Sequence, residues 1–321
     1  MIVDLPDTTT SKISKALVKI REEGGAVALG RVLTLVISTR LGDEEEAIEA
    51  ANDASREHPM RVIVISSGSD APPTDDAPRL DAQIRVGGDA GASEVVVLRA
   101  YGDTASDEEG LVTGLLLPDA PVVAWWPGDA PDVVSQSPIG RIAQRRITDA
   151  AAQPDPRGFL THLSTCYTPG DTDFAWTRLT LWRAQLAAVL DQPPYEQITG
   201  VEVHGSPDSP STSLLAAWLQ LQLDVPAKHE LVTPVHGSSG IQGVRLHRAS
   251  GVIELERTNA GIARLVQPNQ PSHDISLPRR SLRDCLAEEL RRLDPDDLFG
   301  EVIQSGLAQL HEPSLDTASK S

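Results

Sequence analysis

Aromatic side chains are scarce in this 321-residue chain, where Phe, Trp and Tyr together make up 3% of the residues. So few rings leave little for a surface that stacks nucleic-acid bases. Positive charge is also in short supply, because 28 Lys and Arg residues stand against 46 Asp and Glu residues, and the formal net charge is −18. Nonspecific binding to nucleic acid or to anionic lipid needs an excess of Lys and Arg, so the composition argues against both partners.

Cysteine is rare as well. The two thiols, Cys166 and Cys285, lie in no CxxC or other metal-ligand spacing. Two isolated cysteines are typical of a reducing compartment, where they pack as small apolar side chains. No apolar run approaches the roughly 18–20 residues that a membrane helix needs, and residues 1–10 lack the pattern of a signal peptide. We therefore expect a cytoplasmic protein with no membrane association.

The chain does contain an ordinary globular share of hydrophobic residues, 40%, and its length suggests two domains. The segment from Ala150 to Gly170 is rich in Pro, Asp and Gly, which is typical of a connection between domains. We predict an N-terminal domain over residues 1–165, a C-terminal domain over residues 166–312, and a flexible tail over residues 313–321.

The first half alternates strand and helix patterns. Its strands are nearly continuous apolar runs, namely 32–39, 61–67, 94–99 and 121–126. Runs of this kind are typical of strands that are buried on both faces. A helix is predicted to begin after Asp43, whose side chain would cap it. Residues 80–86 alternate between apolar and polar, which predicts an antiparallel edge strand. The N-terminal domain is therefore predicted to be α/β with a mainly parallel sheet.

The second half is predicted to be an α+β domain. A long helix is expected to begin at Asp171. Ser281 and Asp284 form a capping box for a later helix, and Asp294 is expected to cap the last one. Three short strands separated by tight-turn sequences predict an antiparallel meander, namely 244–248, 252–257 and 262–267.

The usual sequence motifs of catalysis are missing. The junction after the first apolar strand, residues 39–43, holds one glycine and no GxGxxG, and no GxxxxGK[ST] occurs in the chain. The sequence also lacks the GxSxG of a nucleophile elbow and the HExxH of a zinc site. We therefore expect no catalytic residue, no metal site and no bound cofactor.

Trp125 and Trp126 are adjacent at the end of a predicted strand. Neighbouring residues of a strand point to opposite faces, so one indole can enter the core while the other faces a crevice, a helix layer or solvent. An outward indole at this end of an α/β strand would mark the edge where a ligand or partner binds. The alternative is that helices bury both.

Arg141, Arg145 and Arg146 concentrate positive charge in an acidic chain. On a helix that begins near Pro138, Arg141 and Arg145 would share one face. Clustered guanidinium groups suit a partner that carries carboxylates. An internal network of ion pairs would use the same residues.

A third group follows along the predicted helix from Asp171. Asp171 and Asp173 lie at its start, Trp176 and Arg183 fall on one stripe, and Arg178 lies on another. Trp and Arg are the residue types most enriched at interface anchors. A helix wedged between the two domains would use them equally well.

These features belong to a set of segments that resembles a known family. The segments, in chain order, are HPMRVIV (58–64), GASEVV (91–96), LLPDAPVV (116–123) with WWPG (125–128), RRITD (145–149), and GDTD (170–173) with Ala175, Trp176, Arg178, Trp182 and Arg183. Their order and spacing resemble the bacterial glucose-6-phosphate dehydrogenase assembly protein, the OpcA family, over nearly the whole chain.

The resemblance implies a non-catalytic subunit. It would bind glucose-6-phosphate dehydrogenase, promote the active oligomer and raise its activity, and so support NADPH production in the oxidative pentose phosphate pathway. The candidate residues for contact with the dehydrogenase are then Trp125, Trp126, Arg141, Arg145, Arg146, Asp171, Asp173, Trp176, Arg178 and Arg183. Some members of the family are regulated through thiols, but this chain has Met60 in a region where relatives can carry Cys, which argues against thiol control here.

Two other interpretations stay open from the residues alone. One is a sugar-phosphate hydrolase or lactonase, in which Arg141, Arg145 and His204 would line a phosphate pocket. The other is a small-molecule sensor whose two domains close on a ligand. Self-association is not decided by the sequence.

Overall fold

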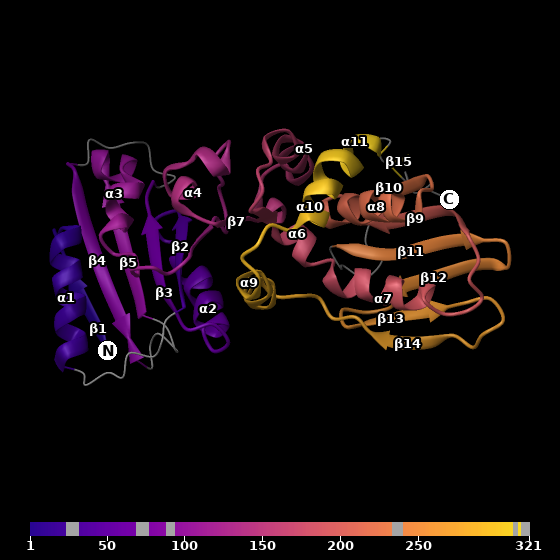
Figure 1. Cartoon of the computed structure of the whole chain (residues 1–321), viewed down its shortest axis with the longest axis horizontal. Coiled ribbons are helices and arrows are strands. Elements are labelled where there is room, and N and C mark those ends of the chain that lie inside the picture. Colours follow the sequence, from indigo (N-terminus) through magenta and orange to yellow (C-terminus); the bar gives the residue numbers. More distant parts are fainter. Residues whose placement is uncertain (24–31, 69–76, 88–93, 233–239, 311–313, 316–321) are drawn as a thin grey trace, which may run out of the picture. The chain divides into compact units, whose positions relative to one another are not determined.

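The computed structural model describes residues 1–23, 32–68, 77–87, 94–232, 240–310 and 314–315 (Figure 1). The chain divides into two compact units. The first comprises Met1–Asp149, Gly170–Thr172 and Ser281–Pro295, and the second comprises Ala150–Pro169, Asp173–Arg280 and Asp296–Ser321. Each unit is therefore built from more than one stretch of the chain.

An eight-stranded sheet forms the centre of the first unit (Figure 1). Its strands in spatial order are β1 (Ile2–Leu5), β4 (Arg79–Val86), β5 (Glu94–Tyr101), β3 (Met60–Ser66), β2 (Leu33–Thr39), β6 (Val122–Trp125), β7 (Arg145–Thr148) and β8 (Asp171–Asp173). The consecutive strands from β5 to β7 pair in parallel, and their apolar side chains are buried. The predicted α/β class with a mainly parallel sheet is confirmed.

The prediction that residues 80–86 form the edge of this sheet is wrong. β4 is antiparallel to β5 as expected, but β1 pairs with its other side, with Ile2 opposite Arg85. The edge is therefore the N-terminal strand. Four residues are too few to show a two-residue period, so no pattern in the sequence predicts β1.

Helices of the first unit are α1 (Thr10–Glu23), α2 (Glu44–Ala54), α3 (Glu108–Thr113), α4 (Pro138–Ile142) and α9 (Leu282–Arg291). The capping box of α9 is confirmed, because the Ser281 hydroxyl accepts from the amide of Asp284 and the Asp284 carboxylate accepts from the amide of Ser281. α9 packs against α2 (Figure 1), and Arg291 donates to Glu57 at 2.7 Å beside that contact. A late stretch of sequence thus completes the first unit.

The helix predicted to run from Pro138 through Arg145 is wrong in its second half. α4 ends at Ile142, and Arg145 to Thr148 form β7, which pairs in parallel with β6. The short RRIT segment carries two β-branched residues, and its place beside a buried strand overrides the local helical pattern. Arg141 and Arg145 therefore do not share a helix face.

The second unit contains a seven-stranded sheet. Its strands in spatial order are β14 (His273–Ser276), β13 (Ile262–Val266), β12 (Gly251–Arg257), β11 (Ile241–Arg248), β9 (Ile198–Gly205), β10 (Ala227–Leu231) and β15 (Ser314–Leu315). The strands from β14 to β9 pair antiparallel, and β10 is parallel to both β9 and β15. The predicted meander is confirmed with one strand more than expected.

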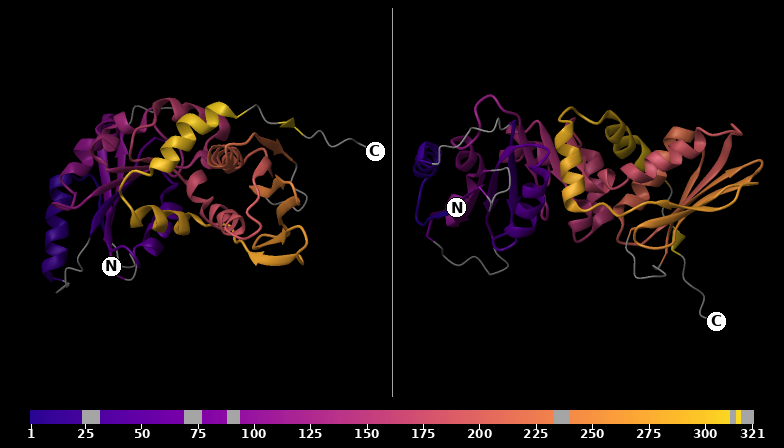
Figure 2. Two further views of the ribbon diagram at one scale, coloured as in Figure 1. Left: turned by 45° about the vertical axis from the view of Figure 1, so that its right-hand side comes forward. Right: turned by 90° about the horizontal axis from the view of Figure 1, so that it is seen from below.

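Helices of the second unit are α5 (Pro156–Cys166), α6 (Phe174–Thr177), α7 (Thr180–Leu190), α8 (Pro210–Leu223), α10 (Asp297–Glu301) and α11 (Leu307–Gln309), with a π-helical turn at Val302–Gly306 (Figure 2). α8 packs on β9 and β10. Among the described residues, none of the helices combines the length and apolar character that crossing a membrane would require.

The single long helix predicted from Asp171 is wrong. Asp171 to Asp173 form β8, and two separate helices follow, α6 and α7. Gly170 has a φ of 100°, a conformation that glycine adopts readily, and it turns the chain into the strand. The cap predicted at Asp294 is also wrong: α10 is capped by Asp296, whose side chain accepts from the amide of Phe299.

Candidate functional site

Trp125 is the last residue of strand β6 and Trp126 follows it, and both are buried, with 0% and 2% of their surface exposed. The amide of Trp126 donates to the carbonyl of Ile147, so the backbone here still belongs to the sheet. Of the two sequence-based alternatives, the structure shows burial of both indoles. Neither presents a face to solvent.

Arg145 and Arg146 are neighbours on β7 and form separate buried ion pairs. Arg145 donates from Nε to Glu289 of α9 at 2.8 Å, and from Nη1 to the carbonyl of Asp294. Arg146 pairs with Asp171 of β8. Each of these charged side chains is at most 8% exposed. For Arg145 and Arg146, the structure therefore shows the alternative of internal ion pairs.

Arg141 lies outside these buried ion pairs. Its side chain is 57% exposed, and it donates to Glu109 at 3.0 Å and to the carbonyl of Gln136 at 2.9 Å. An exposed pair of this kind contributes little to stability, about 0–1 kcal/mol. A partner protein could therefore recruit Arg141 at small cost.

Asp173 and Trp176 order the short helix α6 in the second unit. The Asp173 carboxylate accepts from the amides of Ala175 at 2.8 Å and Ala150 at 2.9 Å. The indole of Trp176 donates to Asp296 at 2.8 Å, and the guanidinium of Arg183 lies 3.8 Å from the centre of its ring. Trp176 is buried, so its contacts serve the fold of this unit.

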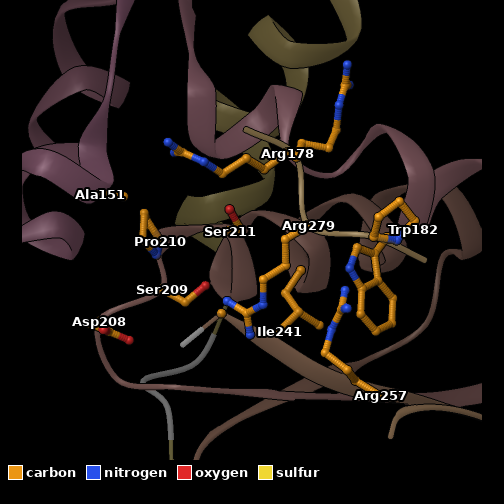
Figure 3. A pocket seen from close by; sticks show the side chains of 13 residues that line it. Ala151, Arg178, Trp182, Asp208, Ser209, Pro210, Ser211, Ile241, Arg257 and Arg279 are labelled. Carbon is orange, nitrogen blue, oxygen red and sulfur yellow. The ribbon is translucent and has the colours of Figure 1, made fainter. Parts of the chain in front are cut away.

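The ten candidate residues differ in how far they are exposed. Arg141 is exposed, Arg178 and Arg183 are half-buried, and the other seven are buried. Arg178 lines a pocket of the second unit (Figure 3). Contact between any of the ten and another protein stays a prediction.

The carboxyl edge of the parallel sheet is where α/β folds bind nucleotides, at the point where strand order reverses. In this chain that point lies between β2 and β6. Arg40, after β2, pairs with Asp129, after β6, at 2.5 Å. Ser38 of β2 donates to Glu108 at 3.0 Å, and burial raises the pKa of that carboxyl above its usual range. Side chains of the chain itself thus bridge this edge.

Glu44 fills the first turn of α2 at the same edge. Its buried carboxylate accepts from the amide of Gly42 at 3.1 Å, from the hydroxyl of Ser66 at 2.7 Å and from Arg99 at 3.2 Å. The prediction that the Asp43 side chain caps α2 is wrong, because that side chain makes no capping bond. Sequence reasoning missed Glu44, although its position just after the first parallel strand is where a pyrophosphate would otherwise bind.

The residues proposed for a hydrolase have separate acidic partners. Arg141 pairs with Glu109, Arg145 with Glu289, and His204 with Glu256 at 2.9 Å. His204 is not among the residues that line the pocket of Figure 3. In the described part of the chain, no group of three or more His, Cys, Asp or Glu side chains is placed to hold a metal ion.

Two family models match this chain, one after the other. Both describe a glucose-6-phosphate dehydrogenase subunit: the model of its N-terminal domain matches residues 51–165, and the model of its C-terminal domain matches residues 169–303. The chain belongs to the OpcA family of glucose-6-phosphate dehydrogenase assembly proteins. Its partner is therefore glucose-6-phosphate dehydrogenase, and its role is in the assembly of that enzyme, as the sequence motifs predict.

Some solved structures align with the chain at low similarity. UDP-N-acetylglucosamine 3-dehydrogenase from Acidithiobacillus ferrooxidans aligns with a TM-score of 0.39 and 8% identity, over 86% of this chain and 96% of that one. An oxidoreductase structure from Magnetospirillum magnetotacticum MS-1 aligns with a TM-score of 0.44 and 12% identity, over 87% and 99%. No curated protein sequence matches the chain at a significant level.

The OpcA motifs that carried the resemblance now have a physical explanation. RRITD is strand β7 with its two buried arginines, and GDTD is the turn and strand β8 that supplies Asp171. WWPG begins at Trp125, the last residue of β6, and continues past the strand with the buried Trp126. In this OpcA-family chain, the three motifs therefore lie at the adjacent strands β6, β7 and β8 and contribute buried side chains there.

Proposed function

We propose that this OpcA-family chain performs no reaction of its own and raises dehydrogenase activity by binding the active oligomer more tightly than other states. An effector shifts an equilibrium only through such a difference in affinity. The observation that supports a non-catalytic role is the bridged carboxyl edge of the parallel sheet. There, Arg40 pairs with Asp129, and the carboxylate of Glu44 accepts from the amide of Gly42 just before α2, which puts negative charge where a nucleotide phosphate would bind.

Exposure divides the candidate residues by role. Arg141, Arg178 and Arg183 keep exposed surface and are proposed to contact the dehydrogenase directly. The seven buried residues are proposed to act indirectly, by holding the strands and helices that carry the contact surface. A cytoplasmic location and a boundary between domains near residue 165 complete the proposal.

Charge is expected to assist the encounter. The chain has a net charge of −18, so a basic patch on the dehydrogenase would attract it over a distance of roughly 10 Å at 0.1 M salt. Attraction of this kind raises the association rate more than it changes the lifetime of the complex.

The test is a titration of the purified chain into purified glucose-6-phosphate dehydrogenase. The expected result is a saturable rise in kcat or fall in KM, together with a shift of the enzyme to a larger oligomer measured by mass photometry. The chain alone should convert neither glucose 6-phosphate nor its lactone.

Arg141→Gln tests the proposed contact surface, and Arg264→Gln is its matched control. Arg264 is also an exposed arginine in a surface pair, with Asp274 at 3.0 Å. The proposal expects Arg141→Gln to weaken association and Arg264→Gln to leave it unchanged. An unaltered enzyme at saturating concentrations of the chain would refute activation, and turnover by the chain alone would refute the non-catalytic role.

A further inference from the structure

A cavity of about 360 Å³ lies within the second unit, and its lining is strongly basic (Figure 3). Four arginines line it, from the end of α6, the end of β12 and the segment before α9: Arg178, Arg257, Arg279 and Arg280. Asp208 is the acidic residue among the described lining residues. A volume of this size fits a small metabolite.

Arg257 carries the argument for an anion. Its Nη1 donates to the backbone carbonyls of Leu277 at 2.8 Å and Ala260 at 3.0 Å, and within the described residues it forms no ion pair with a carboxylate. Burial, and to a lesser degree the positive charge of Arg279, lowers the pKa of Arg257 to about 10. Two guanidinium groups are thus held near each other in a partly dry site, where an anion would stabilise both.

The start of α8 adds to the positive field. Ser209, Pro210 and Ser211 line the cavity, and α8 continues to Leu223. The Ser209 side chain makes no capping bond to the helix, so its hydroxyl is not committed to that role. The N-terminus of a helix favours a negatively charged ligand, above all a phosphate.

Part of the lining is apolar. Trp182 and Ile241 contribute side chains to it, and the guanidinium of Arg257 lies 5.5 Å from the centre of the Trp182 ring (Figure 3). A free inorganic ion would make no contact with the apolar surface of Trp182 and Ile241. A carbon skeleton joined to the anion would cover it.

We propose that this cavity binds the phosphate group of a small phosphorylated metabolite of about the size of a hexose phosphate. The guanidinium groups and the α8 terminus would hold the phosphate, and Trp182 with Ile241 would cover the sugar-sized remainder. The site lies within one unit, so its binding can be measured on the isolated chain. Failure of this proposal and failure of dehydrogenase activation are therefore separate results.

Isothermal titration of the full chain tests the proposal with glucose 6-phosphate, inorganic phosphate and glucose. The expected order is tightest binding for glucose 6-phosphate, weaker binding for inorganic phosphate, and none for glucose. Each of Arg257→Gln and Arg279→Gln should weaken the binding of glucose 6-phosphate roughly tenfold, as expected when one charge-assisted hydrogen bond is lost. Arg264→Gln, on the exposed side of β13, should leave it unchanged.

Asp208→Asn provides a readout that a purely structural role would not give. Asp208 is exposed and lines the cavity, so its replacement should preserve the fold and raise the affinity for glucose 6-phosphate by removing a repelling charge. This variant also keeps the test decisive if Arg257→Gln fails to fold. No binding of glucose 6-phosphate at millimolar concentration, equal binding of glucose, or affinities that none of the three cavity variants alters would overturn the proposal.

Discussion

Arg145 on β7 and Glu289 on α9 form a buried ion pair although they are 144 residues apart in sequence. Each side chain is 5% exposed. The pair ties the late segment Ser281–Pro295 into the first unit, and Thr172 of β8 adds a weaker bond to the same carboxylate at 3.4 Å. The first unit therefore depends on residues that the sequence places close to its end.

Glu289→Gln should lower the free energy of unfolding by about 3–5 kcal/mol, because it leaves the charge of Arg145 buried without its counter-ion. Urea unfolding followed by circular dichroism measures the change. Glu109→Gln is the matched control, since it breaks the exposed pair with Arg141 and should cost at most about 1 kcal/mol. Equal losses in the two variants would contradict the assignment.

A double variant tests whether the ion pair of Arg145 and Glu289 contributes net stability. Replacing both Arg145 and Glu289 by Met should recover most of the stability that Glu289→Gln loses, because paired apolar side chains avoid the desolvation penalty of a buried ion pair. Urea unfolding of the three proteins side by side gives the answer. A double variant as unstable as the single one would show that the ion pair contributes net stability.

Much of the fold was predictable where one local signal agrees with its surroundings. The apolar runs of β2, β3 and β5 could only be strands buried on both faces, and the capping box of Ser281 and Asp284 marks the start of α9 without help from the rest of the chain. In these places propensity, pattern and burial all favour the same structure.

The candidate site was less predictable, because the structures of Arg145 and Asp171 are set by distant neighbours. RRIT is compatible with a helix, and pairing with β6 makes it a strand. Asp171 looks like a helix cap in the sequence, but in the structure it is a buried strand residue that meets the charge of Arg146. No local pattern reports such a pairing, so the sequence does not predict where these side chains lie, and their contact with a partner stays a prediction.

Trp176→Ala should lower the free energy of unfolding by about 3–5 kcal/mol, since the indole is buried and packs against Phe299 at 5.8 Å between ring centres. Trp176→Phe keeps most of the packing and removes the donor to Asp296, so its loss should be about 1.5–3 kcal/mol. Urea unfolding measures both. Equal losses in the two variants would show that the hydrogen bond, and not the packing, dominates.

Thiol oxidation should leave dehydrogenase activation unchanged. No disulfide joins the two cysteines, Cys285 is buried, and the fully buried Met60 stands at the start of β3. The measurement compares activation after treatment of the chain with dithiothreitol or with diamide. A reversible loss of activation that Cys166→Ser abolishes would contradict this prediction and assign a regulatory role to the half-buried thiol.

Glu108→Gln should stabilise the protein at pH 8 and have no effect near pH 4. Burial raises the pKa of Glu108 in the folded state. Its contribution to the free energy of unfolding is therefore fully present below the unfolded pKa of about 4.3, and it is lost as the pH rises through the folded pKa. Glutamine mimics the neutral acid and avoids that loss. Urea unfolding of variant and parent at several pH values measures the difference.

Glu45→Gln should show the opposite dependence on pH. A hydrogen bond from Arg85 lowers the pKa of Glu45 in the folded state. The contribution of Glu45 to the free energy of unfolding is therefore present above the unfolded pKa, and it is lost as the pH falls through the folded pKa. The variant should therefore be less stable than the parent at pH 7 and equal to it at low pH. The effect should be small, because the carboxylate is 61% exposed. Parallel curves for Glu45→Gln and Glu108→Gln would contradict both assignments, since burial raises the pKa of Glu108 and the hydrogen bond from Arg85 lowers the pKa of Glu45.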